Sequence, residues 1–403
     1  MRKIDLNNFQ VASSETARDI NRRIVLNLIR KNQPVSRASL ARRSGLQRST
    51  VSAITEQLIA ERWVTEGALG NVPRGRKPTF LNLNSDRCGI IGVDIRPITT
   101  TLAVASLDAH FVAQESIPTG NNPEEFISRL GRRITDLMRA HPRSSYEGIG
   151  VSLPGRIDER TQRLIFAPSL NWGEVDIKAP LERATGLKVE LENAANACAL
   201  AELWSGRHGE AVRNLVAVTV SEGIGVGMVI NGQLVKGATG VAGEFGHVAL
   251  VENGIQCRCG NHGCWETLAS NLAAVRYYTG SALHRKGEVG SKSDVNRITF
   301  GDLLRLAEQG DAKAQRALVQ TAEQLGAGLA MLISGLAPDI LVVIGEITRA
   351  WPRIGGVVEV ALKKRAFTHA ATRIMPTDPD LQPRLKGTIA LVLQKHFGAP
   401  FAS

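Results

Sequence analysis

Three cysteines and two histidines lie close together in the second half of the chain, at Cys257, Cys259, Cys264, His247 and His262. Thiolate sulfur and imidazole nitrogen are ligands that zinc prefers, and four of them close a tetrahedral site. On spacing alone, His247 and His262 compete to be the nitrogen ligand. Four protein ligands leave no position for a catalytic water, so the ion would be structural. In a chain expected to lie in the cytoplasm, such a cluster suggests a metal before a disulfide. The sequence therefore predicts one structural Zn2+ per chain.

The positive charge of the chain is concentrated at its beginning. Residues 1–85 hold 15 Lys+Arg against 6 Asp+Glu, a net charge of +9, whereas the remaining residues hold 34 against 32, a net charge of +2. A basic segment attached to a nearly neutral body is typical of a nucleic-acid-binding module, although a solvated basic surface would give the same count.

The pattern within this basic segment predicts a helix-turn-helix. Ser36 is a candidate N-cap, Ala41 is a small residue where two helices can cross, and Gly45 suits the tight turn between them. Val51 and Ile54 then fall on the inner face of the second helix, which we expect from about residue 47 to 61. The opposite face and N-terminus carry the candidate base-contacting residues, which are Gln47, Arg48, Ser49 and Ser52.

A β-hairpin wing is predicted after the second helix. Between two short apolar segments the chain has glycines, prolines and the basic residues Arg74, Arg76 and Lys77. Basic side chains at the tip of a wing can enter the minor groove or contact phosphates. We therefore expect residues 1–85 to form a winged helix-turn-helix that binds double-stranded operator DNA.

The rest of the chain alternates short apolar runs with helical stretches, as α/β proteins do. The runs expected to be buried strands are residues 90–93, 102–104, 148–151, 215–218 and 340–344. There is no run of 18 apolar residues, so no membrane span is expected. The first residues are charged and polar rather than apolar, unlike a signal peptide, so the expected location is the cytoplasm.

Residues 240–266 carry the most specific motif of the chain. Gly243-Glu244-Phe245-Gly246-His247 precedes the cysteine cluster, and in this arrangement the chain resembles the ROK family of bacterial repressors and sugar kinases, and within it the repressor branch. The resemblance implies a two-lobed, actin-like, sugar-kinase-like α/β fold. It places the first lobe at residues 86–195, completed by a C-terminal helix at about 386–397, and the second lobe, with the zinc-binding loop, at residues 196–380. It also selects His247 as the metal ligand.

The resemblance further implies a sugar site in the cleft between the lobes. The positions that match the family's sugar-binding residues are Asn193, Glu244, His247 and Glu266, and Asn171, beside Trp172, is a further candidate. Carboxylates and amides suit this role because sugar hydroxyls both donate and accept hydrogen bonds. His247 could serve the metal and the sugar through its two ring nitrogens.

The kinase chemistry of the family is interrupted at four places. Ala194 stands where the catalytic Asp is expected, and an alanine takes no proton from a sugar hydroxyl. Arg96 stands two residues after Asp94, where the family has a glycine that lets the backbone approach phosphate. Glu222 and Glu346 put carboxylates at two further nucleotide-binding positions of the family. We therefore expect no enzyme activity.

These features together predict a sugar-controlled transcriptional regulator, most simply a repressor of carbohydrate genes. A sugar or sugar derivative in the cleft would favour one arrangement of the lobes and change operator affinity in a homodimer or homotetramer. Two alternatives remain open. The cleft could be vestigial, with a protein partner in control, or the chain could be a DNA-binding sugar kinase in which the four altered elements are dispensable.

Overall fold

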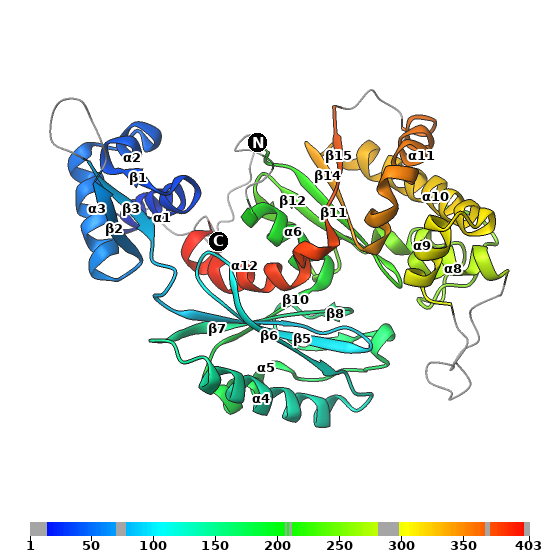
Figure 1. Ribbon diagram of the computed structural model, residues 1–403, viewed down its shortest axis with the longest axis horizontal. Coiled ribbons are helices and arrows are strands. Elements are labelled where there is room, and N and C mark those ends of the chain that lie inside the picture. The colour runs from blue at the N-terminus through cyan, green and yellow to red at the C-terminus, as the bar shows by residue number, and fades with distance from the viewer. Residues whose placement is uncertain are drawn as a thin grey trace.

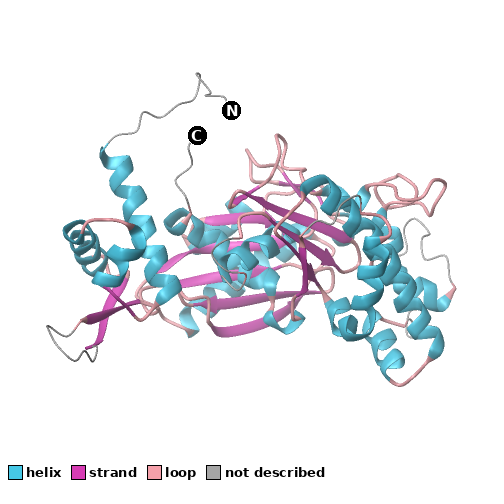
Figure 2. Ribbon diagram, turned by 90° about the horizontal axis from the view of Figure 1, so that it is seen from above, coloured by secondary structure: helices cyan, strands magenta, loops and turns pink. Residues whose placement is uncertain are grey.

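The protein has three parts in a row, with the N-terminal domain at one end and the helices of the second lobe at the other (Figures 1 and 2). The structure is a computed structural model of the 403-residue chain. It describes residues 14–69, 78–205, 208, 212–280, 298–366 and 371–398.

The N-terminal domain is a winged helix-turn-helix. Its elements are α1 (Ser14–Asn32), β1 (Val35–Ser36), α2 (Arg37–Ser44), α3 (Arg48–Ala60), β2 (Val64–Leu69) and β3 (Thr79–Leu83), with sheet order β1-β3-β2. The Ser36 side chain accepts a hydrogen bond from the backbone N–H of Ser39 and so caps α2. Gly45 ends α2 with a φ of 72°, which a glycine adopts without strain. Both residues therefore have the local roles that the sequence predicts.

The first lobe is a five-stranded sheet with helices on both faces. Its strands are β4 (Gly89–Asp94), β5 (Thr99–Ala105), β6 (Phe111–Pro118), β7 (Tyr146–Leu153) and β10 (Val189–Asn193), in the order β10-β7-β4-β5-β6. Helices α4 (Pro123–Ala140) and α5 (Lys178–Thr185) cover one face and α12 (Pro383–Phe397) the other (Figure 1). A Cβ on Gly150 would lie 2.0 Å from the carbonyl oxygen of Thr388, so the backbones of β7 and α12 are in direct contact. A small hairpin follows β7, formed by β8 (Arg156–Ile157) and β9 (Leu164–Phe166), and leads into η1 (Pro168–Leu170).

The second lobe is built on the sheet β13-β12-β11-β14-β15. Its strands are β11 (Leu215–Val220), β12 (Ile224–Ile230), β13 (Gln233–Leu234), β14 (Ile340–Ile344) and β15 (Arg373–Pro376). Its helices are α6 (Ala194–Ser205), η2 (Glu244–His247), α7 (Trp265–Ala269), α8 (Asn271–Thr279), α9 (Phe300–Glu308), α10 (Ala312–Leu336), η3 (Glu346–Ala350), α11 (Trp351–Lys363) and η4 (Pro379–Leu381). Alternate residues of β11 face opposite layers, because Val216 and Val218 pack in the core with α10 whereas Leu215 and Ala217 pack in the core with α6.

The predicted α/β class and two-lobed arrangement are confirmed. Each of the five apolar runs expected to be strands lies within β4, β5, β7, β11 or β14. Among the helices that the structure describes, none is long and apolar enough to cross a membrane.

Candidate functional site

The three cysteines and His247 form one compact cluster. One ligand atom from each of His247, Cys257, Cys259 and Cys264 lies within 4.8 Å of all the others. The Sγ atoms of Cys259 and Cys264 are 3.7 Å apart, and Cys257 Sγ is 3.5 Å from His247 Nδ1. Zinc–ligand distances of about 2.3 Å for sulfur and 2.0–2.1 Å for nitrogen, at tetrahedral angles, would give about 3.8 Å and 3.6 Å. These two pairs of donors are therefore spaced as a tetrahedral ion requires, and the cluster could hold a metal ion.

Tight backbone packing brings these ligands together. Gly263, with a φ of 67°, lies so close to the loop before it that a Cβ there would be 1.8 Å from the carbonyl oxygen of Val251. Isolated β-bridges join Ala249 to Cys264 and Gln256 to His262. The His262 side chain is exposed and does not belong to the cluster. The structure therefore groups the cysteines with His247 and not with His262.

Burial keeps two thiols of the cluster protonated. Desolvation raises the pKa of the Cys264 thiol to about 11 and also raises the pKa of Cys257. Without a cation these two thiols are therefore neutral near pH 7, and a bound cation would be needed to hold them as thiolates.

A cavity of about 540 Å³ lies next to the cluster, between the two lobes. Four of the five predicted sugar-binding residues line it, namely Asn193, Glu244, His247 and Glu266. Asn171 does not line it. Its side chain is exposed, and its left-handed backbone, with a φ of 56°, ends η1. The structure therefore brings four of the candidates together and leaves Asn171 outside.

His247 belongs to both the cluster and the cavity, and the cavity residue Glu266 lies beside the cluster. His247 Nδ1 is 3.5 Å from Glu266 Oε1, and Nε2 on the other side of the ring is 3.6 Å from Glu244 Oε2. Glu266 Oε1 also accepts a hydrogen bond from Cys257 Sγ at 2.9 Å. Burial raises the pKa of Glu244, with the neighbouring Glu266 carboxylate adding to the effect. A metal on the cluster would therefore fix the orientation of His247, which is also a cavity residue.

Asn193 joins the cavity to the start of α6. Its amide nitrogen donates to the carbonyl of Gly155 at 2.8 Å, and its amide oxygen accepts from the N–H of Ala195 at 2.8 Å. Each amide atom can form one more hydrogen bond, so the side chain can still bind a ligand hydroxyl. Ala194, the next residue, presents only a methyl group to the cavity.

Glu192 and Lys236 also line the cavity, and neither was predicted from the sequence. The buried carboxylate of Glu192 lies 2.8 Å from Lys236 Nζ and accepts a hydrogen bond from Asn196. Burial opposes the charge on Lys236, but the Glu192 carboxylate outweighs it and raises the lysine pKa. Glu192 directly precedes the Asn193 motif, whereas no local pattern points to Lys236 as its partner.

Two ion pairs join Asp94 to arginines at the edge of the cavity. Asp94, only 1% exposed, lies between Arg96 (Nε to Oδ2, 2.7 Å) and Arg384 (Nε to Oδ1, 2.9 Å). Both arginines line the cavity, as do Glu222 and Glu346. Arg96, Glu222 and Glu346, the three charged residues at the altered kinase positions, therefore all line this one cavity.

The recognition-helix candidates lie on the outer side of the N-terminal domain. Gln47, Arg48 and Ser49 are exposed and Ser52 is half-buried, whereas Val51 on the opposite face is fully buried. Strands β2 and β3 pair antiparallel, as a wing requires. The wing residues Arg74, Arg76 and Lys77 lie outside the described residues.

The fold and site thus define a DNA-binding domain joined to a sugar-kinase-like domain. Residues 18–65 match winged helix-turn-helix DNA-binding domains, and residues 90–394 match the ROK family. The chain belongs to the ROK family.

Transcriptional regulators and a sugar kinase both resemble this chain. The xylose repressor of Bacillus spizizenii is 29% identical over 392 residues, which cover 96% of this chain and 98% of that repressor. The crystal structure of a ROK family transcriptional regulator, a homologue of the E. coli MLC protein, matches with a TM-score of 0.78 and 25% identity, over 95% of this chain and 98% of that one. A ROK family glucokinase from Streptomyces griseus, in complex with glucose and AMPPNP, matches with a TM-score of 0.65 and 25% identity, over 76% and 99%.

Proposed function

We propose that this protein is a sequence-specific DNA-binding repressor of carbohydrate genes, controlled by a sugar or sugar derivative in the interlobe cavity. The observation that carries the proposal is the convergence of Asn193, Glu244, His247 and Glu266 on one cavity, in a chain that also has a winged helix-turn-helix. A volume of about 540 Å³ suits a small ligand. Similarity to a xylose repressor and to a ROK transcriptional regulator supports the same function.

The cluster of His247, Cys257, Cys259 and Cys264 would hold one structural Zn2+. Three sulfurs and one nitrogen at near-tetrahedral spacing favour zinc over the harder cations, which prefer oxygen. The bound ion would hold the loop that carries the cavity residues, and it would take no part in chemistry.

Kinase activity is not part of this proposal. Ala194 offers no base, and Arg96 with the carboxylates of Glu222 and Glu346 occupies the region where a nucleotide would need a phosphate cradle. Loss of the carboxylate at position 194 also removes a partner for one sugar hydroxyl, worth about 1–3 kcal/mol. A pentose that lacks this hydroxyl would not lose a hydrogen bond at Ala194. A phosphorylated sugar would avoid the repulsion that an Asp carboxylate would exert at this position. Equal affinities for a hexose, a pentose and a sugar phosphate in calorimetry would contradict this specificity.

Operator DNA would be bound by two copies of the recognition helix in a homodimer or homotetramer. Helix-turn-helix dimers contact half-sites one helical turn apart. A strictly monomeric protein, on and off DNA, would contradict this arrangement.

Ala194 also favours a second candidate function, in which the cavity is vestigial and a protein partner controls DNA binding.

A thermal-shift screen of the zinc-loaded protein against sugars, amino sugars and their phosphates tests the proposal. A ligand that binds the native state raises the melting temperature. We expect one class of sugar to do so, and we expect Glu244→Ala to abolish the shift. Glu252→Ala is the matched control, because Glu252 is an exposed carboxylate of the same lobe outside the cavity. No shift with any sugar, while DNA and zinc still bind, would favour the partner-controlled candidate.

A further inference from the structure

One face of α1 in the DNA-binding domain contacts the ends of two helices of the body. Arg23, Asn27 and Arg30 follow one another at spacings of four and three residues, so they lie on the same side of α1. Arg23 donates to the carbonyl of Gly398 at 2.9 Å and Asn27 donates to the carbonyl of Phe397 at 2.7 Å. Arg30 donates to the carbonyl of Trp204 at 2.8 Å.

These carbonyls are the C-terminal carbonyls of α12 and α6. The last four carbonyls of a helix lack partners within the helix, and they form its negative end. The Arg30 guanidinium also lies over the Trp204 ring, 4.0 Å from its centroid, and the Phe397 ring packs edge-on against Trp204. Burial lowers the Arg30 pKa to about 10.

The opposite ends of the same two helices lie at the cavity. Helix α6 starts at Ala194 and α12 starts at Pro383, and both residues line the cavity, as does Arg384. At a rise of 1.5 Å per residue, α6 spans about 18 Å and α12 about 22 Å. The two helices therefore run side by side from the cavity to α1 (Figure 1).

The two helices pack on different lobes. A Cβ on Gly227 of β12 would lie 2.3 Å from the carbonyl oxygen of Ala195, so α6 rests on the sheet of the second lobe. Helix α12 rests on β7 of the first lobe. They touch each other where a Cβ on Gly387 would lie 1.9 Å from the carbonyl oxygen of Ala197. This contact makes the α6–α12 pair the joint between the lobes.

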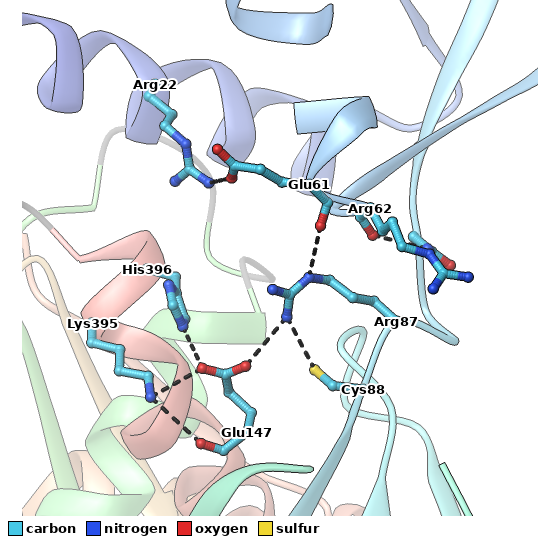
Figure 3. Close-up of polar contacts among 9 residues, drawn as sticks. Arg22, Glu61, Arg62, Arg87, Cys88, Glu147, Lys395 and His396 are labelled. Carbon is cyan, nitrogen blue, oxygen red and sulfur yellow. Dashed lines mark hydrogen bonds and ion pairs between the residues drawn. The ribbon is translucent and has the colours of Figure 1, made fainter. Parts of the chain in front are cut away.

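Other contacts hold the DNA-binding domain on the first lobe (Figure 3). Arg87 donates to the carbonyl of Glu61 at 3.3 Å, just after α3, and its guanidinium lies 3.2 Å from the Glu147 carboxylate of β7. The Arg87 guanidinium also lies over the Trp63 ring, at 3.8 Å from its centroid. His396 of α12 binds Glu147 from the other side at 2.7 Å. The domain is thus anchored on β7 and α12, and Arg30 extends from it to α6.

We propose that α1 detects the relative position of the lobes through the ends of α6 and α12, with Arg30 as the positioning residue that couples the cavity to the recognition helix. This inference rests on the proposed function, since it assigns how the cavity ligand would act on DNA. A rotation of the lobes by about 10° about the Gly387 contact moves Trp204 by about 2 Å relative to α12, given seven residues of helix between Ala197 and Trp204. That displacement breaks the Arg30 contacts or moves α1 with them.

The first test compares Arg30→Ala with Arg23→Ala, a matched control that removes an arginine-to-carbonyl bond on the first-lobe side. DNA affinity is measured on a fragment that the wild type selects from a random library, with and without D-glucose, D-xylose or glucose 6-phosphate, whichever stabilises the wild type. We expect the sugar to change wild-type affinity on the order of 5–150-fold, and the change to fall below about twofold in Arg30→Ala but not in Arg23→Ala. Unchanged sugar binding of Arg30→Ala in calorimetry would exclude a damaged cavity.

An equal sugar response in Arg30→Ala and the wild type would overturn the coupling and leave the proposed function intact. No sugar binding by the wild type would instead overturn the proposed function.

The second test needs no sugar. Gly387→Ala should force α6 and α12 apart and change DNA affinity of the ligand-free protein several-fold, on the scale of an allosteric coupling. Gly356→Ala in α11, where a Cβ meets nothing within 4 Å, should leave it unchanged. A folded Gly387→Ala protein with wild-type DNA affinity would overturn the inference, and the Arg30 comparison decides it if that variant does not fold.

Discussion

Replacement of Cys259 by serine isolates the contribution of the metal from that of packing. Cys257 and Cys264 are buried, whereas Cys259 is exposed. A substitution at an exposed position changes stability by no more than about 0.5 kcal/mol when no special interaction is lost. Any large effect of Cys259→Ser therefore reports the loss of a metal ligand.

The size of that effect follows from mass action. A ligand present at 100 to 1,000 times its dissociation constant stabilises the native state by about 2.7–4.1 kcal/mol. For a large domain each kcal/mol corresponds to about 2–4 °C, so Cys259→Ser should lower the melting temperature by roughly 5–16 °C in zinc-containing buffer. A strong chelator should lower the wild type to the same value and leave the variant almost unchanged.

The assay combines zinc content by mass spectrometry with thermal unfolding. His262→Ala is the matched control, because His262 is an exposed ligand-type residue of the same loop outside the cluster. It should keep one zinc per chain and the wild-type melting temperature. A wild type that binds no zinc, or a Cys259→Ser variant that keeps both its zinc and its stability, would rule out the cluster as a zinc site.

Three further predictions concern the cavity and the two lobes. Ala194→Asp should not create ATP-dependent sugar phosphorylation in a coupled ADP-release assay, since Arg96 stays in the phosphate region; measurable turnover would contradict this. Burial opposes ionisation of Glu147, but hydrogen bonds from α12 outweigh it and lower its pKa from 4.5 to about 2. The stabilisation by the Glu147 carboxylate is therefore complete above about pH 4.5 and is lost as the pH falls towards 2. Glu147→Gln should reduce the dependence of the unfolding free energy on pH across that range. An unchanged pH dependence in the variant would contradict this role of Glu147. Gly328→Ala should destabilise the second lobe by about 1–3 kcal/mol in denaturant unfolding, because the added Cβ would lie 1.9 Å from the ring of Trp265. A variant as stable as the wild type would show that the Trp265 ring moves away without cost.

Features that depend on neighbouring residues could be predicted from the sequence. The Ser36 cap and the Gly45 turn each act within a few residues, and the three cysteines of the candidate metal cluster lie within eight residues. Spacing alone does not separate His247 from His262. Asn171, in contrast, does not line the cavity. Its neighbour Trp172 is a buried core residue, and Asn171 itself suits the left-handed turn that ends η1.

Features that join distant segments could not be predicted. Arg384 meets Asp94 only because α12 packs back on the sheet of the first lobe, and Lys236 meets Glu192 only where the two lobes face each other. The alignment of Arg30 with the end of α6 likewise depends on where the DNA-binding domain docks. Hydrophobic periodicity predicts strands and helices, but it contains no information on which helix ends meet.

Control of DNA binding by the cavity is tested most directly by the affinity of the full-length protein for its selected DNA fragment, measured by fluorescence anisotropy while the stabilising sugar is titrated. We expect the affinity to change on the order of 5–150-fold in the wild type and to stay constant in Glu244→Ala. A sugar that binds the wild type and leaves its DNA affinity unchanged would contradict the proposed control by the cavity ligand.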